Sequence, residues 1–297
     1  MPPVEVRSFQ RLDRDQLAAL VNSHIAAVVP GVQVSVNTLL ARMEREPGES
    51  IVDPWVVERR TLVAVERDAV VAGAHLHLYG ADDRVGESYR GAAEFRWIVV
   101  RPDASAAADA LVRACLDVFA RWQARARYAD CSLPAPFCYG ISDCWPHLRE
   151  LLVRNGFAHE GHVELILQAA VADLPQPAGP PLTGLELRRK VGAVGTCLAA
   201  VLEDIEVGLI EVEQLTAGGR NPESVVWADI GNLCVMEEHR RRGIATWLLG
   251  NTADWLRLGS VERLASYVWP EQDDLLSFLR ATGFRELTRT ARGWVHR

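Results

Sequence analysis

The chain has 297 residues, of which 49% are hydrophobic and 24% are charged, and its formal net charge is −7. This length is about twice that of an average domain and favours two domains. The negative charge argues against a surface dedicated as a whole to nucleic acid. No apolar run reaches the roughly 18 residues of a membrane span, and the first residues do not resemble a signal peptide. We therefore expect a cytoplasmic protein without a membrane partner.

The six cysteines include no CxxC pair. A zinc site would require closer paired spacing, usually with histidine. We therefore expect no metal and interpret the cysteines as small apolar side chains.

Hydrophobic periodicity in the first half predicts an α/β domain. The expected elements, in chain order, are a strand at Val4–Phe9, a helix at Asp13–Ile25, a hairpin at Thr61–Leu78, a strand at Glu94–Val100, helices at Ala106–Ala124 and before Gly156, and a strand at Val163–Leu167.

A linker is predicted where the first half ends. Val171–Pro181 contains four prolines and one glycine, a composition that excludes regular helix. We therefore expect an N-terminal module at 1–170, a proline-rich linker at 171–183 and a C-terminal module at 184–297.

The second half predicts a similar series of elements. These are a strand at Leu185–Arg188, a helix at Val191–Leu202, strands at Val207–Leu215 and Trp227–Val235, a helix at Gly243–Leu258, a strand at Leu264–Trp269, a helix at Asp273–Thr282 and a last strand from Gly293. In both halves a helix ends at a Gly-Phe pair, Gly156-Phe157 and Gly283-Phe284, where glycine allows a positive φ and phenylalanine packs back on the sheet. This correspondence indicates duplication.

The sequence between the strand ending at Val235 and the next helix has the properties of an anion site. Arg240-Arg241-Arg242-Gly243-Ile244-Ala245-Thr246 leads into the helix. The first N–H groups of a helix have no partner within it, and the helix dipole is positive there. Small residues at Gly243 and Ala245 let a pyrophosphate approach the backbone, while arginines add positive charge.

This pattern resembles the GNAT N-acetyltransferase superfamily, whose signature is [Gln/Arg]-x-x-Gly-x-[Gly/Ala], with an aliphatic residue five positions earlier. Arg240, Gly243, Ala245 and Val235 match it, and Gly283-Phe284 is the second landmark. The resemblance covers the second half well and the first half weakly. It implies two GNAT-like α/β modules, each a mixed central β-sheet flanked by helices.

The resemblance also implies positions for the acyl donor, acetyl-CoA. N–H groups of Arg241, Arg242, Gly243, Ala245 and Thr246 would bind the pyrophosphate. Main-chain groups of Leu233 and Val235 would pair with the pantetheine arm where the sheet splays, and Gln272 stands where relatives often have the asparagine that touches this arm.

The first half departs from the signature. Its equivalent loop starts at Arg101-Pro102-Asp103, lacks glycine and places a negative charge where phosphate would bind. We expect a degenerate N-terminal module that binds no cofactor or binds one weakly. The arrangement is similar to mycothiol synthase, another tandem member of the superfamily whose C-terminal module performs the chemistry.

Acyl transfer to an amine requires a base for the amine and an acid for the thiolate. Relatives often use a carboxylate on the strand before the loop. The matching residue is Asp229, and Glu94 has the same offset in the first half. The usual acid, a tyrosine, is replaced by Leu279, so Tyr267 or Ser266 could act, or water could protonate the thiolate.

Glu211 and Glu213 lie two residues apart and share one face of their strand. They could bind a cationic amine, or they could form the solvent-facing side of an edge strand.

These features together predict an N-acyltransferase that moves acetyl from acetyl-CoA to a small-molecule amine in the C-terminal module. One alternative is a protein that binds acyl-CoA without turnover. Another is a transferase with a different donor, such as aminoacyl-tRNA, whose binding would fall steeply with salt. The sequence leaves the acceptor and the oligomeric state open.

Overall fold

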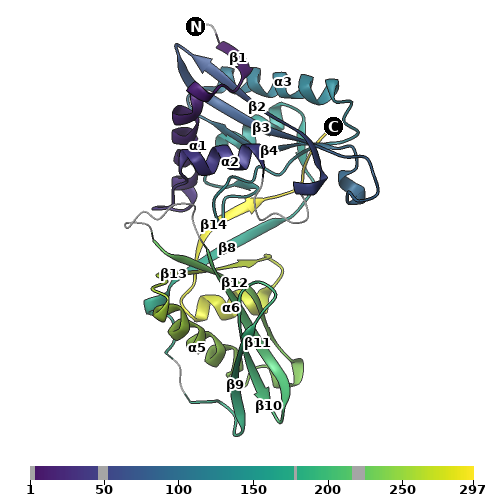
Figure 1. Cartoon of the computed structure of the whole chain (residues 1–297). Helices are drawn as coiled ribbons and strands as arrows, with labels where there is room; N and C mark the ends of the chain where they lie inside the picture. Colours follow the sequence, from purple (N-terminus) through teal and green to yellow (C-terminus); the bar gives the residue numbers. More distant parts are fainter. Residues whose placement is uncertain (1–3, 46–52, 177–178, 216–224) are drawn as a thin grey trace. The chain divides into compact units, whose positions relative to one another are not determined.

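The structure is a computed structural model that describes residues 4–45, 53–176, 179–215 and 225–297. The described chain divides into two compact units (Figure 1). The first unit contains the residues up to Val163 together with Thr288–Arg297, and the second contains those from Glu164 to Leu287. Each unit is built around its own β-sheet flanked by helices. The expected mixed α/β architecture with two sheets is therefore confirmed.

The first unit has a seven-stranded sheet in the order β1-β2-β3-β4-β5-β15-β7. Its strands and helices are β1 (Val4–Ser8), α1 (Arg14–Val28), α2 (Val36–Glu44), β2 (Val56–Glu66), β3 (Ala69–Tyr79), β4 (Ala93–Val100), α3 (Ser105–Arg121), β5 (Arg127–Ala129), β6 (Ile141–Ser142), α4 (Pro146–Arg154), β7 (Phe157–His159) and β15 (Trp294–His296).

Close packing of α1 on β3 illustrates how this core forms. Leu17 on α1 is fully buried, and a Cβ added to Gly73 on β3 would lie 2.6 Å from its Cδ1 atom. Glycine at this strand position therefore lets the helix approach the sheet.

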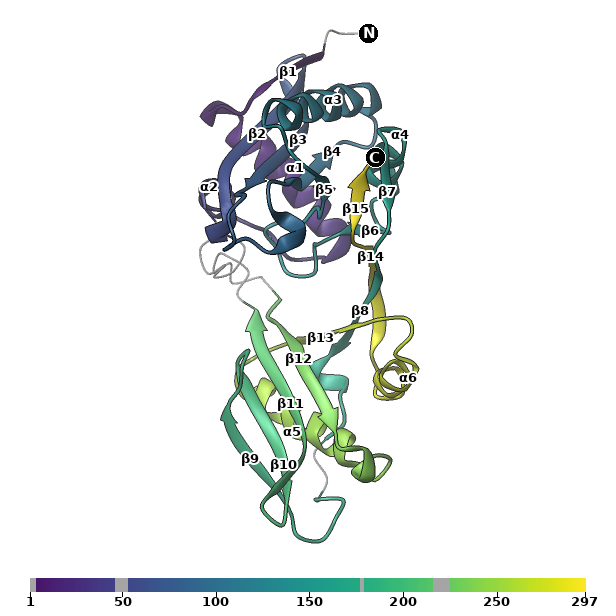
Figure 2. The ribbon, with the colours of Figure 1, turned by 90° about the vertical axis from the view of Figure 1, so that its right-hand side faces the viewer.

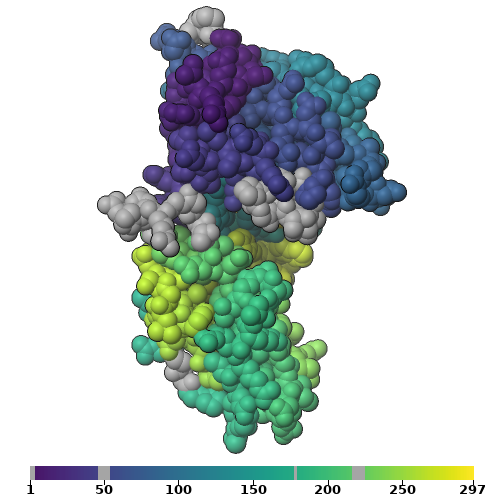
Figure 3. Space-filling model, viewed as in Figure 1, coloured from purple at the N-terminus to yellow at the C-terminus, as the bar shows by residue number. Residues whose placement is uncertain are grey.

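The second sheet has eight strands in the order β6-β14-β8-β13-β12-β11-β10-β9. The elements of the second unit are β8 (Val163–Ala170), β9 (Leu185–Val191), β10 (Thr196–Leu202), β11 (Ile205–Leu215), β12 (Trp227–Val235), α5 (Ile244–Leu258), β13 (Arg263–Val268), α6 (Asp273–Ala281) and β14 (Arg285–Ala291). Apolar residues of α5 pack on β10, β11 and β12. The edge strand β9 exposes six of its seven residues, and it lies among the teal-green atoms of the lower part of Figure 3.

The last strand of each half belongs to the sheet of the other unit. β8 pairs with β13 of the second unit, for example at Leu167↔Ser266. β15 lies between β5 and β7 of the first unit, with Trp294 opposite Ala129 on one side and His159 on the other (Figure 2). The boundaries expected from sequence place β8 in the N-terminal module at 1–170 and β15 in the C-terminal module at 184–297. In the structure, β8 pairs with a strand of the second unit and β15 pairs with strands of the first.

The expected linker is anchored to the second unit where it begins. Val171 and Leu174 are buried in its core, and Nη2 of Arg257 on α5 donates hydrogen bonds to both of their carbonyl oxygens. Residues 177–178 of this linker lie outside the described residues.

The helix expected at Val191–Leu202 is wrong. The segment ends β9 and forms β10, and the two strands make a hairpin in which Thr196 pairs with Val191. Two glycines, Gly192 and Gly195, explain the turn, and a Cβ on Gly192 would lie 2.3 Å from Oε1 of Glu211. Gly195 has φ +131°, and a Cβ there would lie 2.5 Å from the carbonyl oxygen of Val212. A helix would require neither feature.

The two Gly-Phe pairs have the expected conformation. Gly156 and Gly283 have φ +84° and +97°, and the phenylalanines after them are 3% and 2% exposed. Among the described residues, no helix is both long and apolar enough to cross a membrane.

Candidate functional site

The arginine-rich loop connects β12 to α5 through a short 3₁₀ turn at Glu237–His239. Two of its residues have left-handed backbone conformations, Arg241 with φ +58° and Gly243 with φ +85°. Gly243 is the N-cap of α5 and is exposed. The chain therefore turns sharply just before the helix, and only the glycine adopts this conformation without steric strain.

The backbone N–H groups of this loop are available to a ligand. The first bond of the α5 region runs from the Trp247 N–H to the Gly243 carbonyl, at 3.0 Å, and no side chain caps the helix. Within the described part of the chain, no acceptor is found for the N–H groups of Arg241, Arg242, Gly243, Ala245 and Thr246. These are the donors that the sequence assigns to a pyrophosphate, and the helix dipole adds positive potential there.

The three arginine side chains differ in their contacts. Arg240 Nε donates to the Val235 carbonyl oxygen at 3.0 Å. Arg241 forms an exposed ion pair with Asp274, at 3.1 Å. Arg242 is exposed and makes no side-chain hydrogen bond or ion pair with the described residues. Arg242 is therefore the cation of the loop that is free to meet an anion.

A gap opens between β12 and β13 beside this loop. The two parallel strands pair from Trp227↔Arg263 to Ile230↔Ser266, and the described pairing stops there. β12 continues to Val235 while pairing only with β11, and β13 continues along β8. The sheet therefore splays at this point, as the family resemblance implies.

Main-chain groups of β12 face this gap. The N–H of Met236 donates to the Val207 carbonyl on β11, so this pair is hydrogen-bonded. Hydrogen-bonded and non-hydrogen-bonded pairs alternate along an antiparallel ladder. The N–H and C=O groups of Leu233 and Val235 therefore point away from β11. These main-chain groups are the ones that the sequence assigns to the extended pantetheine arm.

The linker lies against the loop. A Cβ on Gly243 would be 3.3 Å from the Cβ of Pro181, which is tight for a real side chain. No local pattern predicts this contact, because the two residues are far apart in the chain.

Asp229 and Tyr267 come together below the gap. Asp229 lies on β12 opposite Glu213 of β11, and the Tyr267 hydroxyl donates a hydrogen bond to its carboxylate. Its other oxygen, Oδ1, is buried and has no partner among the described residues. Burial and the neighbouring charge of Glu213 raise the pKa of Asp229 to about 6, against the opposing effect of the Tyr267 bond. A carboxyl group with such a pKa is suited to proton transfer near neutral pH.

The other acid candidates are placed differently. Ser266 is 4% exposed and, as the neighbour of Tyr267 on β13, points to the opposite face of the sheet. Leu279, at the position where relatives often have tyrosine, is fully buried in the core. Tyr267 is therefore the candidate with a hydroxyl next to Asp229.

Gln272, the residue expected near the pantetheine arm, accepts a hydrogen bond at Oε1 from the Trp269 N–H, at 3.0 Å, and so closes the turn before α6.

β11 is not an edge strand, because it lies between β10 and β12. The sequence interpretation of Glu211 and Glu213 as the solvent side of an edge strand is therefore wrong. Glu211 is 8% exposed and accepts the Ala193 N–H at 3.0 Å. Glu213 is exposed beside Asp229.

In the first unit, β4 corresponds to β12, and the segment after β5 forms hydrogen bonds along it. The N–H groups of Cys131 and Ser132 donate to β4 carbonyl oxygens at 3.2 and 2.6 Å. At the end of β4, the Val100 N–H donates to His24 Nε2 at 3.3 Å, and His147 Nε2 donates to the Val100 carbonyl at 3.1 Å. Both main-chain groups of Val100 are therefore bonded, whereas the partner that the structure shows at Val235 is Arg240 Nε on the carbonyl oxygen. Sequence reasoning missed both histidines, because these contacts join distant parts of the chain.

The first-unit loop is also neutralised internally. Arg101 forms an ion pair with Asp103, with Nη2 and Oδ2 at 2.6 Å. Ser105, the first residue of α3, accepts a hydrogen bond from Arg154 Nη2 at 3.3 Å, and no side chain is found to cap this helix among the described residues. This helix start therefore lacks the free cation found at Arg242.

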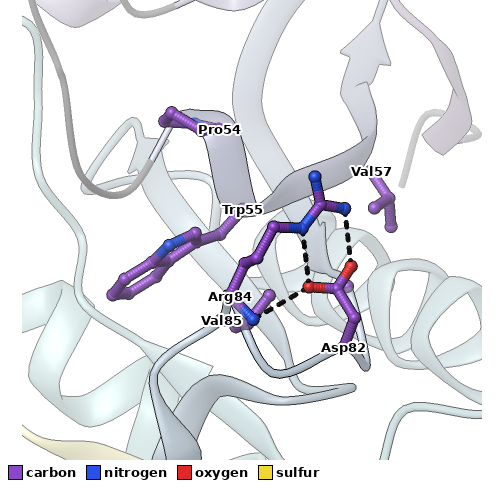
Figure 4. A pocket seen from close by; sticks show the side chains of 7 residues that line it. Pro54, Trp55, Val57, Asp82, Arg84 and Val85 are labelled. Carbon is purple, nitrogen blue, oxygen red and sulfur yellow. Dashed lines mark hydrogen bonds and ion pairs between the residues drawn. The ribbon is translucent and has the colours of Figure 1, made fainter.

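One cavity of the first unit has about 320 Å³ and is lined by Pro54, Trp55, Val57, Gly80, Asp82, Arg84 and Val85 (Figure 4). Arg84 and Asp82 bond each other there, with Nη2 and Oδ2 at 2.9 Å. The two charges of this cavity therefore neutralise each other. The cavity lies in the first unit and is not part of the candidate site in the second. No group of three or more potential metal ligands is found in the parts of the chain that the structure describes.

Comparison with known families gives one match. Residues 148–284 match the model of the Acetyltransferase (GNAT) family. The matched region includes the loop at Arg240–Thr246, Asp229 and Gly283-Phe284. None of the curated proteins compared with the chain matches it.

Solved structures with the same fold include a tandem protein. A tandem GNAT protein from the clavulanic acid biosynthesis pathway has a TM-score of 0.64 at 15% identity, with 99% of this chain and 97% of that chain covered. A GCN5-related N-acetyltransferase from Sphaerobacter thermophilus has a TM-score of 0.59 at 15% identity, with 99% and 95% covered.

A fungal multi-domain β-N-acetylglucosaminidase with a GCN5-related glucosamine N-acetyltransferase region has a TM-score of 0.64 at 13% identity. The match covers 100% of this chain and 38% of the fungal chain. At these identities the structural matches establish the fold, which is that of two GNAT modules in tandem.

Proposed function

We propose that this chain, of which residues 148–284 match the GNAT acetyltransferase family, is an acyl-CoA-dependent N-acyltransferase with its active site in the second unit. The proposed donor is acetyl-CoA, and the proposed acceptor is the amine of a small molecule. The observation that carries the proposal is the row of N–H groups without acceptors at the start of α5, beside a splayed sheet.

Three features support a donor site in the second unit. The N–H groups from Arg241 to Thr246 fit a diphosphate, and Arg242 supplies a free positive charge. Leu233 and Val235 present main-chain groups to an extended pantetheine arm. In the first unit the matching N–H group, that of Val100, is bonded to His24, which favours one donor site per chain.

When bound, the acyl donor supplies a thioester carbon that an amine attacks. A new C–N bond forms and the C–S bond breaks. Asp229 accepts the proton that the amine loses, since its raised pKa makes it a stronger base than an ordinary carboxylate. Its buried Oδ1, which has no partner among the described residues, is the atom proposed to receive that proton.

The leaving thiolate must gain a proton. Tyr267 is the proposed donor, because its hydroxyl lies beside Asp229 and on the same face of the sheet. The hydrogen bond from Tyr267 also fixes the orientation of the Asp229 carboxylate.

The acceptor is proposed to be an ammonium ion before it reacts, so it loses two protons in all. One passes to Asp229 before the attack, and the other leaves the attacking nitrogen and restores the Tyr267 hydroxyl after Tyr267 has protonated the thiolate. Glu213 is exposed directly opposite Asp229 on the neighbouring strand, so an ammonium group at this position meets two carboxylates. This arrangement favours a small amine over a neutral alcohol.

A thiol-release assay with acetyl-CoA and a panel of small primary amines tests the proposal. We expect release that depends on the amine and that Asp229→Asn lowers by at least about 100-fold. CoA binding without release for any amine would instead support a non-catalytic acyl-CoA-binding protein. RNA binding that falls steeply with salt, in the absence of CoA binding, would support an aminoacyl-tRNA donor.

A further inference from the structure

One face of the second sheet carries the two carboxylates of the proposed acceptor position. The strands β9 to β12 lie side by side in this sheet (Figure 2). Val212, Ala228 and Ile230 belong to the apolar core that α5 covers. Their neighbours along the strands, Glu213 and Asp229, therefore point to the opposite face, because side chains alternate along a strand. A side chain that borders these two carboxylates on that face would contact the acceptor.

The turn between β9 and β10, residues 192–195, lies on this polar face. The Ala193 N–H donates to Oε1 of Glu211, which points to the same face as Glu213. A Cβ on Gly195 would lie 3.3 Å from the Cβ of Glu213, so the turn reaches the carboxylates. In the first unit, the chain between the two corresponding strands, β1 and β2, forms the helices α1 and α2. The second unit therefore has a short turn where the first has two helices.

Val194, in this turn, covers the backbone of β12 near Asp229. A Cβ on Gly231 would lie only 2.4 Å from Cγ2 of Val194, so the valine side chain lies directly on the strand there. The valine is 42% exposed, and it therefore presents apolar surface on this face. Gly231 follows Asp229 by two residues, and two strand residues span at most about 7 Å. A short alkyl chain can bridge that distance from the carboxylate to the valine.

We propose that Val194 is a specificity-determining residue of the acceptor site, and that the acceptor is a primary amine whose nitrogen carries a short hydrocarbon chain. The ammonium group meets Asp229 and Glu213, while the chain packs on the exposed side of Val194 and leaves water. Glu211 is a positioning residue, because its bond to the Ala193 N–H holds the turn on the sheet. The inference rests on the proposed function and narrows its acceptor from a small amine to an aliphatic one.

Steady-state acyl transfer from acetyl-CoA to butylamine and to 2-methoxyethylamine tests this inference with the full chain. The two amines have chains of equal length, but the second has an ether oxygen in place of one methylene. The wild type should have the lower KM for butylamine. Val194→Thr replaces a methyl by a hydroxyl, and it should reduce this preference by at least about threefold through KM, with kcat unchanged. Gly231→Ala adds a methyl that displaces Val194, at a position without a left-handed φ, and it should reduce the preference as well.

Val191→Thr is the matched control, since Val191 precedes the same turn and is 91% exposed. It should leave the preference unchanged, and all three variants should bind CoA like the wild type. Turnover with an unchanged preference in Val194→Thr would overturn this inference and leave the proposed function intact, also if Gly231→Ala does not fold. Absence of turnover with every amine would contradict the proposed function and this inference together.

Discussion

The Tyr267 hydroxyl donates a hydrogen bond to the carboxylate of Asp229, across the point where β12 and β13 begin to separate. This contact joins the two residues that sequence reasoning selected separately as acid and base. It also opposes the burial and the Glu213 charge that raise the Asp229 pKa. The residues therefore form one proton-transfer unit, whose properties depend on both side chains.

Removing the tyrosine hydroxyl should raise the Asp229 pKa further. Because the hydrogen bond favours the ionised carboxylate, Tyr267→Phe removes a contribution that lowers this pKa. A carboxyl ¹³C NMR titration should place the wild-type midpoint near pH 6 and the variant midpoint higher. Ser266→Ala, which alters the opposite face of the same strand, should leave the midpoint unchanged. A variant midpoint at or below the wild-type value would show that the bond does not act in this way.

Asp229 should reduce stability at neutral pH. Its folded-state pKa, about 6, lies above the ordinary value of 3.8, so folding favours the neutral form. Stability from this group is fully present below about pH 4 and is lost as pH rises to about 6. Asp229→Asn should therefore raise the free energy of unfolding at pH 7 by about 1–2 kcal/mol, after allowance for partial exposure, while activity falls. Urea unfolding at pH 4 and pH 7 measures this, and a variant less stable than the wild type at pH 7 would contradict it.

Arg242 should contribute electrostatically to CoA binding. Its guanidinium is exposed and has no partner among the described side chains, so Arg242→Ala removes a cation without breaking an internal bond. We expect an affinity loss of about fivefold at low salt, shrinking as salt screens the interaction. Arg280→Ala, an exposed arginine on α6, is the matched control and should have no effect. A loss that does not change with salt would refute a charge interaction.

The pairing of the terminal strands makes a prediction about truncation. Removing Arg292–Arg297 deletes β15, which pairs with both β5 and β7 of the first unit. Because those strands lose their shared partner, the first unit should be destabilised by a deletion at the far end of the chain. Hydrogen exchange should increase at Phe157–His159 more than along β10 and β11. Unchanged exchange in β7 would exclude this pairing.

Much of the site could be predicted from the sequence because its signals are local. The loop at Arg240–Thr246 combines a strand end, a glycine with positive φ and a helix start within a few residues. The Gly-Phe pairs depend equally on local backbone conformation. The offset of Asp229 from the loop predicts its position, because the period of a strand fixes which residues share a face.

The remaining features depend on contacts that no short segment contains. Thr196–Leu202 is rich in alanine and leucine and is compatible with a helix, whereas its strand conformation follows from pairing with β9 across the turn at Gly192 and Gly195. The assignment of β8 and β15 to their sheets depends on which distant strands pair, since both have an ordinary strand pattern. The Val100 contacts with His24 and His147 likewise join distant segments.

Titration of CoA into the wild type and two matched glycine variants tests the central claim most directly. Gly243→Glu and Gly283→Glu each place a glutamate at a positive-φ position of the second unit, but only Gly243 lies in the loop, and a side chain at Gly283 would meet no atom within 4 Å. Calorimetry should give one CoA site per chain in the wild type and in Gly283→Glu, and an affinity at least about 100-fold weaker in folded Gly243→Glu. Equal CoA affinity in the two variants would contradict a diphosphate site at the start of α5.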